Sequence, residues 1–477
     1  MTAWVRPERP VTTVARPEPA WIEGLVSAAL CCAVAMFIAS GALVVAAAAL
    51  ACLTVLVVLL YRSHWLPMAW IVGMPTLFVF PNNVLYPILT LLTVERVLFA
   101  LLVALLGVRV LFGKAAVLPL FTVEKWMALV LGVVVLSLLS TAAEKSFADL
   151  YKSAVLLIQA FLMPFAAFLL VRTTSWRHEH FVHLFRLLSL AGLYLAVTGA
   201  LQYFLQTRIF MPSYAPLHKM DRASGPFVSP VEYGAVMVVL GLVTLFQYAR
   251  TKDALARAFW LVVLVPILGG VVLSKTRAVW VAAVLAFALV SRSDRRVRPV
   301  VIAGGILAIG FAIFAELAAG RVEEVSPIFN RIALWATAAN VFVHHPVLGV
   351  GFGADSFVQN RTAYFASFGP VTAEWAAEAG PPHNDLLHLL VMMGLAGTIP
   401  YVLVWVAAVK LTRRPGTVRG EGASFAEDLA VYIRASAIVA IVNALFADAL
   451  YFTYLLTLVF FLLGILVVSR RGASGSA

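Results

Sequence analysis

The chain has 477 residues, of which 62% are hydrophobic and 12% are charged, and its mean hydropathy is +0.97. About a quarter of the residues in a soluble domain are charged, so this composition excludes a soluble globular protein. Within lipid, only helices and closed barrels satisfy every backbone polar group, and the apolar runs here are too long and continuous for barrel strands. We therefore predict an all-α polytopic integral membrane protein.

The net charge of +12 follows from the expected topology. If both termini are cytoplasmic, 24 of the 35 Lys and Arg residues lie on the cytoplasmic side and 11 lie outside, as the positive-inside rule favours. On the same assignment 13 of the 23 acidic residues lie outside, so the excess positive charge is cytoplasmic. The basicity is then a property of membrane topology, and we exclude nucleic acid as a partner.

Taken in chain order, residues 1–20 have the composition of a disordered tail, and about fourteen apolar helices follow. The first and last pairs each come from one apolar run of nearly forty residues, divided at Ser40-Gly41 and near Asp448 because one span uses about 20. The predicted helices lie near residues 22–39, 42–60, 65–80, 95–112, 126–141, 150–171, 181–206, 230–248, 256–273, 277–291, 299–317, 384–409, 431–447 and 450–469.

We expect about 12–14 of these helices to span the membrane. The predicted organisation is a cytoplasmic tail at 1–20, N-terminal spans at 21–220, a functional core at 221–410, C-terminal spans at 411–469 and a second tail at 470–477. The core contains one long extracytoplasmic loop, residues 317–382, because the basic residues place this segment outside.

The long loop contains an expected amphipathic helix. Ser326-Pro327 has the form of a helix start, and His345-Pro346 ends the pattern. Apolar residues recur at helical spacing, which predicts an amphipathic helix lying on the membrane surface: Ile328, Ile332, Trp335, Ala339 and Phe342. The following segment, Gly349 to Gly353, predicts a tight loop; it lacks the Lys-Ser/Thr of a phosphate-binding loop, so we do not expect a nucleotide site.

Three arginines fall on the expected outer face: Arg222, Arg277 and Arg331. Arginine is always charged and presents a planar fork of donors, so several arginines at one surface suit a diphosphate. Two other interpretations stay open. Arginines near helix ends reach towards lipid phosphates, and the stem of Arg331 can pack on Trp335, four residues later.

His383 stands at the N-terminus of a predicted membrane helix, on the same outer face. The positive end of the helix dipole disfavours an imidazolium there, so the ring is expected to be neutral and able to accept a proton. It is a candidate general base for a hydroxyl nucleophile. The alternative is that His383 or Asn384 only caps the helix.

Other histidines do not suggest a metal site. The sequence His178-x-His180-x-x-His183 falls on the expected cytoplasmic side, beside Arg177. His383 and His388 are five residues apart, which does not align two imidazoles on a helix. We therefore expect no metal at either position.

Several motifs occur together and in order between residues 220 and 410. They are Arg222 to Gly234, Ser274-Lys275-Thr276-Arg277 with Trp280, Arg331 with Trp335 followed by His345 to Gly353, and His383-Asn384-Asp385 leading to Gly394-Leu395-Ala396-Gly397. Together they resemble the O-antigen ligase and O-antigen polymerase superfamily. Val231 departs from the family pattern, where an asparagine is common.

The resemblance implies a membrane glycosyltransferase of the bacterial inner membrane, with its active site on the periplasmic side. It implies His383 as the catalytic residue, Arg277 and Arg331 as diphosphate-binding residues with Arg222 as a third, and Asn384 in support. No cofactor or metal is implied, and the sequence contains no Asp-x-Asp motif. The reaction would transfer glycan, with inversion, from an undecaprenyl-diphosphate-linked oligosaccharide.

The implied acceptor is either a lipid-linked glycan repeat, for a polysaccharide polymerase, or lipid A core, for an O-antigen ligase. We favour the polymerase. Membrane lipids and a chain-length regulator are the further implied partners. The rival class is a lipid-linked glycan flippase or transporter, but such proteins usually show paired repeats and charges near the midplane, and here the candidate charges stand at one face.

Overall fold

The computed structural model describes residues 64–77, 94–111, 120–207, 221–306, 310, 326–367, 371–372, 380–413 and 421–474. These residues form helices and turns, and none of them lies in a strand. The helices are α3 (Trp65–Leu77), α4 (Val94–Leu111), α5 (Thr122–Thr141), η2 (Ala142–Glu144), α6 (Phe147–Leu157), η3 (Ile158–Leu162), α7 (Met163–Thr173), α8 (His178–Leu205), α9 (Pro230–Arg250), α10 (Ala254–Leu273), α11 (Arg277–Ser293), α13 (Ser326–His344), α14 (Ser356–Asn360), α16 (Asp385–Leu411), α17 (Glu421–Phe446), η5 (Ala449–Tyr451) and α18 (Thr453–Ser474). Residues 298–306 are also helical.

Within the described residues, eight helices are long and apolar enough to cross a membrane, and each coincides with a predicted span. This confirms the predicted class of polytopic all-α membrane protein. Of the other predicted helices, those near 22–39 and 42–60 lie outside the described residues, and the one near 299–317 is described only to residue 306. Helices α3, α4 and α11 match the remaining three predictions in position.

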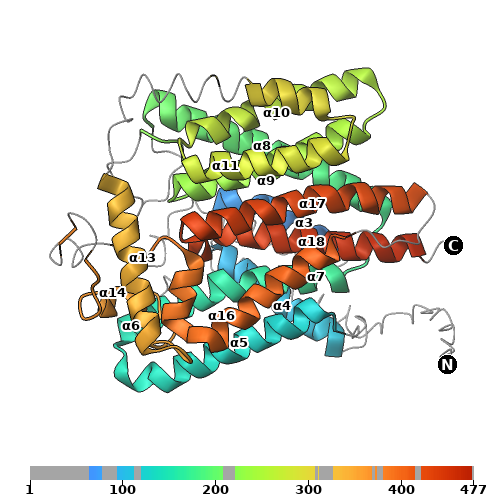
Figure 1. The fold of residues 1–477 in the computed structure, drawn as a ribbon. Coiled ribbons are helices and arrows are strands. Elements are labelled where there is room, and N and C mark those ends of the chain that lie inside the picture. The colour runs from blue at the N-terminus through green and yellow to red at the C-terminus, as the bar shows by residue number, and fades with distance from the viewer. Residues whose placement is uncertain are drawn as a thin grey trace, which may run out of the picture. The chain divides into compact units, whose positions relative to one another are not determined.

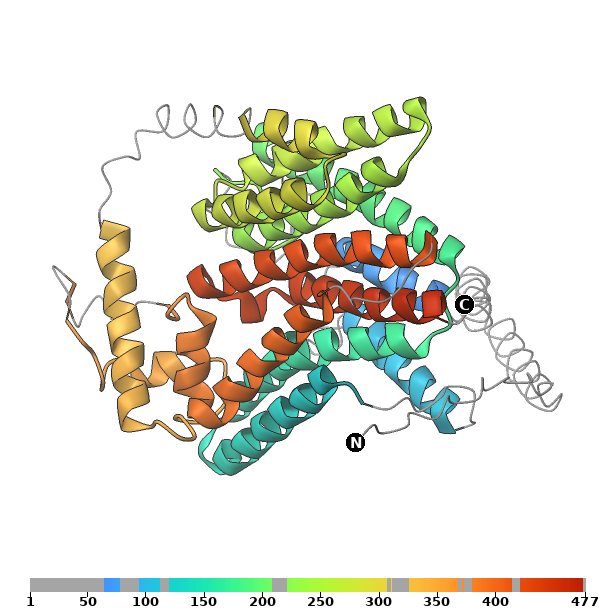
Figure 2. The same ribbon diagram turned by 45° about the vertical axis from the view of Figure 1, so that its right-hand side comes forward.

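The long helices pack side by side, and α13 lies across their direction at one end (Figures 1 and 2). Helix α18 packs on α7, α10 on α9, α11 on α17 and α16 on α5. Helices α9 and α18 are the most deeply buried of the candidate spans, with 89% of each apolar window covered by protein. The core of the bundle therefore lies around these two helices.

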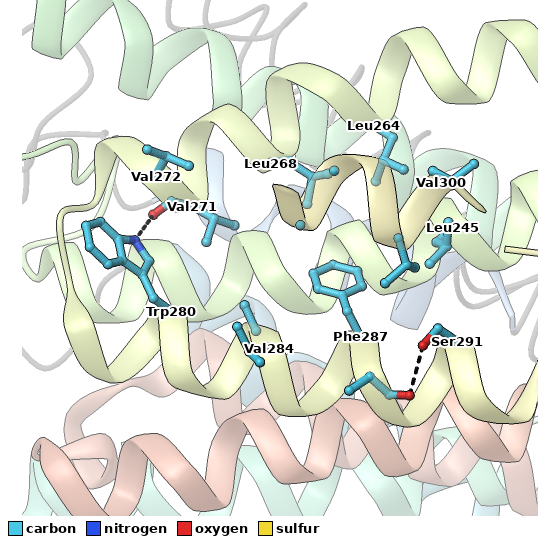
Figure 3. Close-up of a pocket in the computed structure, with 15 residues that line it drawn as sticks. Leu245, Leu264, Leu268, Val271, Val272, Trp280, Val284, Phe287, Ser291 and Val300 are labelled. Carbon is cyan, nitrogen blue, oxygen red and sulfur yellow. Dashed lines mark hydrogen bonds between the residues drawn. The ribbon is translucent and has the colours of Figure 1, made fainter. Parts of the chain in front are cut away.

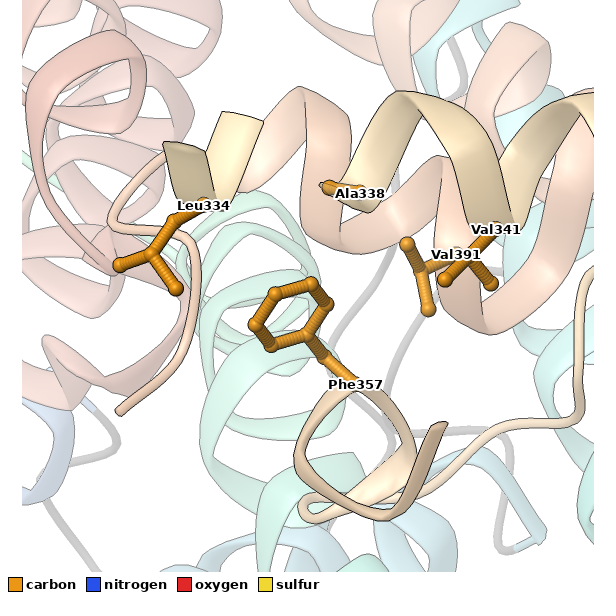
Figure 4. Close-up of a cluster of buried hydrophobic side chains, with 5 residues drawn as sticks. All are labelled: Leu334, Ala338, Val341, Phe357 and Val391. Atoms are coloured by element: carbon orange, nitrogen blue, oxygen red, sulfur yellow. The ribbon is translucent and has the colours of Figure 1, made fainter. Parts of the chain in front are cut away.

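The helix expected in the long loop is present as α13, and His344 is its last residue, directly before His345-Pro346. The apolar residues expected to face the membrane are not packed inside the protein: Ala339 is exposed, and Ile332 and Phe342 are only partly covered. The side that packs on α14 and α16 carries Leu334, Ala338 and Val341, which meet Phe357 and Val391 (Figure 4). Apolar residues occur on two sides of α13, and packing on α16 decided which side is buried.

The turn that follows α13 docks into a break in α16. At Gly394 the helix has φ 55° and ψ −154°, which interrupts its hydrogen-bond ladder. The backbone of residues 346–350 satisfies the groups released there, so the break stays compatible with a buried position. The hydrogen bonds run from Val350 N to Val391 O (2.8 Å), from Leu395 N to Pro346 O (2.9 Å) and from Ala396 N to Val347 O (3.0 Å).

The predicted division of the last apolar run near Asp448 is confirmed. Helix α17 ends at Phe446, the short helix η5 forms the turn, and α18 begins at Thr453. Asp448 stands directly before η5, and its carbonyl accepts from Tyr451 N (3.1 Å). This turn presents Asp448 towards the start of α16.

Candidate functional site

His383 lies against Asp448 at the start of α16. Its Nδ1 is 2.5 Å from Asp448 Oδ2, and the imidazole is 44% exposed whereas the carboxyl is 12% exposed. A carboxylate at Nδ1 fixes that nitrogen as the donor and leaves Nε2 as the acceptor. This geometry is that of a histidine able to accept a proton at Nε2, with a carboxylate placed to stabilise the imidazolium that would form.

The backbone at His383 has φ +52°, in the left-handed region that residues other than glycine rarely adopt. Such strain costs about 1–3 kcal/mol and persists only where neighbouring contacts hold it. The helix cap is supplied by Asn384, whose Oδ1 accepts from Leu387 N (3.1 Å) and whose Nδ2 donates to Leu445 O (3.0 Å). Since Asn384 caps the helix, the His383 side chain is not used for capping.

Helix α13 is tied to the same place by Trp335. Its indole N–H donates to the carbonyl of Pro382 (2.9 Å), the residue before His383. Arg331 precedes Trp335 by four residues and so lies one turn away on the same side of α13, where it is exposed.

Arg222 binds the turn between α10 and α11, and Arg277 directly follows that turn. The Arg222 guanidinium donates to Ser274 O (3.1 Å), Lys275 O (3.2 Å) and Thr276 Oγ1 (2.7 Å). Arg277 is the first residue of α11 and is exposed. Arg222 thus fixes the turn that presents Arg277.

The turn before Arg277 and the His383–Asp448 pair lie at one end of the helix bundle. Helix α11 packs on α17, and its first residues lie beside the end of α17 that leads to Asp448 (Figure 1). Helix α13 and the start of α16 lie at the same end (Figures 1 and 2). The arrangement places His383, Arg277 and Arg331 at one end of the molecule, with both arginines exposed.

Sequence reasoning missed the partner of His383. Asp448 served only to divide a long apolar run, although a carboxylate inside such a run is a signal of function in a membrane protein. The same reasoning named Asp385 only as part of a motif and His388 only as an unlikely metal ligand, and both are buried. Asp385 Oδ1 accepts from Leu450 N (3.2 Å), which attaches the first turn of α16 to the turn that carries Asp448.

An apolar groove of about 420 Å³ opens between α10 and α11, with residues 298–306 along one side (Figure 3). Its lining is aliphatic and aromatic apart from Ser291 and the indole of Trp280, whose N–H is bonded to Val271 O (3.2 Å). Trp280 lies one turn after Arg277, so the groove begins close to that cation. The volume suits part of one hydrocarbon chain.

His178 and His180, near the start of α8, pack against other aromatic rings. The rings of His64 and His180 stack with centroids 3.5 Å apart, and His178 packs against Phe425. Within the described part of the chain, no group of three or more His, Cys, Asp or Glu side chains is placed to hold a metal ion.

Residues 262–402 match the family model described as O-Antigen ligase. This segment is therefore similar to the O-antigen ligase family. It contains Arg277, Arg331 and His383 and leaves Arg222 and Asp448 outside, and it lies within the predicted core of residues 221–410. The match confirms the predicted superfamily and indicates an enzyme of the membrane glycosyltransferase type. No curated protein matches the chain.

Proposed function

We propose that the protein is a polysaccharide polymerase that transfers glycan from an undecaprenyl-diphosphate-linked donor to a sugar hydroxyl of a lipid-linked acceptor repeat. The observation that carries this proposal is the contact between His383 Nδ1 and Asp448 Oδ2, inside and beside the segment that is similar to the O-antigen ligase family. The contact supplies an oriented base on the face that carries exposed arginines. The reaction would take place at the periplasmic face of a bacterial inner membrane.

On the donor side, Arg277 and Arg331 bind the diphosphate oxygens, and Arg222 contributes by holding the turn that presents Arg277. A planar guanidinium fork matches a phosphate better than a point charge does. The isoprenoid tail lies in a lateral groove among the apolar helices. The departing lipid diphosphate gains negative charge, so these arginines act where charge develops in the transition state.

On the acceptor side, His383 Nε2 takes the proton of the attacking hydroxyl. The hydroxyl oxygen then bonds to the anomeric carbon as the bond from that carbon to the diphosphate breaks, which inverts the configuration. Asp448 offsets the positive charge that His383 gains. The arginines neutralise the leaving group, so the proposed reaction needs no divalent metal.

A second candidate is ligation, in which the same donor is transferred to lipid A core. The description of the matched family model, O-Antigen ligase, favours this alternative. The two reactions share donor, base and leaving group, and they differ in the acceptor alone.

We expect the purified protein to extend a lipid-linked repeat and to do so in the presence of EDTA. The assay offers the undecaprenyl-diphosphate donor with either a second lipid-linked repeat or lipid A core, and product length is read by electrophoresis and mass spectrometry. Transfer to lipid A core alone would replace polymerase by ligase. Activity that EDTA abolishes and magnesium or manganese restores would contradict the proposed metal-independent reaction.

We expect Arg277→Ala and Arg331→Ala each to lower transfer by at least tenfold, and Arg→Lys at either position to restore little, because lysine cannot supply a bidentate fork. Arg257→Ala is the control, since Arg257 lies near the other end of α10 and donates to Tyr248 Oη (3.1 Å). Initial rates at several donor concentrations measure the effect. Unchanged rates in both alanine variants would remove these arginines from the site.

A further inference from the structure

A group of ionisable side chains surrounds the carboxyl of Asp448, and all of them except Asp448 itself have no part in the reaction described above. His388 and Asp385 come from α16, and Asp448 and Tyr451 come from the turn between α17 and α18. His388 is fully buried, and its ring stacks against Tyr451 with centroids 6.2 Å apart. The Asp448 carboxylate and the His383 ring both lie within electrostatic range of His388.

Several buried polar atoms of this group lack a hydrogen-bond partner among the described residues. They are both ring nitrogens of His388, Asp448 Oδ1 and Asp385 Oδ2. A buried polar atom left without a partner destabilises the fold, so donors and acceptors that lie near one another are expected to pair. His388 can donate to Asp448 Oδ1, because an imidazole always carries at least one N–H whereas an ionised carboxylate only accepts.

We propose that His388 is a positioning residue that donates a hydrogen bond to Asp448 Oδ1, directly or through one buried water molecule, and so completes a His383–Asp448–His388 chain. One carboxylate oxygen of Asp448 then accepts a hydrogen bond from His383, and the other accepts one from His388. This inference rests on the proposed function, because it concerns the base of that reaction. His388 touches no substrate and acts through Asp448.

The role of His388 in this chain is to moderate the proton affinity of the His383–Asp448 pair. Until His383 takes a proton, the His383–Asp448 pair has the net negative charge of the Asp448 carboxylate. A hydrogen bond from His388 therefore stabilises the unprotonated pair more than the protonated pair. Removing the donor therefore makes the pair easier to protonate. The charged groups that act on His388 are Asp448 and His383, and Tyr451 packs against its ring; all three stay unchanged in the variants below.

The expected result for His388→Leu is a shift of the acid limb of the pH profile of kcat/KM to higher pH by about one unit, since one unit corresponds to about 1.4 kcal/mol and a hydrogen bond to a charged group is of that order. His388→Gln keeps an N–H donor and should restore the wild-type profile. His388→Met replaces the leucine variant where that variant does not reach the membrane folded. The matched control is Thr398→Val, which removes another buried unpartnered polar atom from the same helix and should leave the profile unchanged.

A wild-type pH profile in His388→Leu or in His388→Met would overturn the proposal, as would an equal shift in His388→Gln. A second measurement separates this outcome from failure of the proposed function. The rate at which diethyl pyrocarbonate modifies His383, read by mass spectrometry of its peptide across pH, reports the unprotonated ring and needs no glycan substrate. If no transfer is found with any acceptor, the same shift in this modification profile still supports the chain, and its absence still refutes it.

Discussion

His383→Gln should lower glycan transfer by about 10²–10⁴, the usual contribution of a general base, while the protein remains folded in the membrane. The imidazole is partly exposed and its hydrogen-bond partner is Asp448, whereas the cap of α16 comes from Asn384. Loss of the ring therefore removes the base without removing the helix start. Rates of transfer, together with thermal unfolding in detergent, measure the two effects separately.

Asp448→Asn tests the same assignment through the partner. The asparagine NH₂ can donate to Nδ1, which places the ring proton on Nε2 and removes the acceptor that the reaction needs. We expect at least a tenfold loss, and little further loss when this change is combined with His383→Gln, because residues that act as a unit are not additive. His344→Ala is the control histidine, since His344 is exposed at the end of α13. Wild-type product from His383→Gln at normal expression would eliminate the mechanism.

Periodicity and composition were enough to predict the long helices, because a span of apolar residues has one stable conformation in lipid. The same signals could not show that Leu334, Ala338 and Val341 of α13 pack against Phe357 and Val391. Nor could they show that residues 346–350 enter a break in α16. Both features depend on packing between segments that are distant in sequence.

The candidate site divides in the same way. His383 and Arg277 carry recognisable local sequence, so their types and order could be interpreted without a structure. Asp448 lies 65 residues beyond His383, and only the return of the chain through α16 and α17 brings the two together. The sequence-based view that a helix dipole governs His383 therefore lacked its nearest charge, the carboxylate at Nδ1.

Gly349→Ala and Gly394→Ala should each destabilise the protein by about 2–5 kcal/mol, the sum of about 1–2 for a left-handed backbone and about 1–3 for overpacking. Gly349 has φ +67° and Gly394 has φ +55°. A Cβ on Gly349 would lie 2.6 Å from the Met392 carbonyl carbon, and one on Gly394 would lie 2.7 Å from Leu348 N. In both cases the obstacle is backbone, which cannot rotate away as a side chain can.

Gly132→Ala supplies the matched control, because Gly132 lies inside α5 and nothing stands within 4 Å of the position that a Cβ would occupy there. Alanine at this position should be neutral or stabilise the helix by about 0.5–1 kcal/mol. Thermal unfolding in detergent and the yield of folded protein measure all three variants.

Gly349 and Gly394 lie where the turn after α13 docks on α16. Alanine at either position should therefore also loosen α13, move Arg331 relative to His383, and abolish transfer in any protein that still inserts. Normal stability in both variants would mean that the turn does not dock into the break of α16. It would also contradict the placement of α13 beside His383.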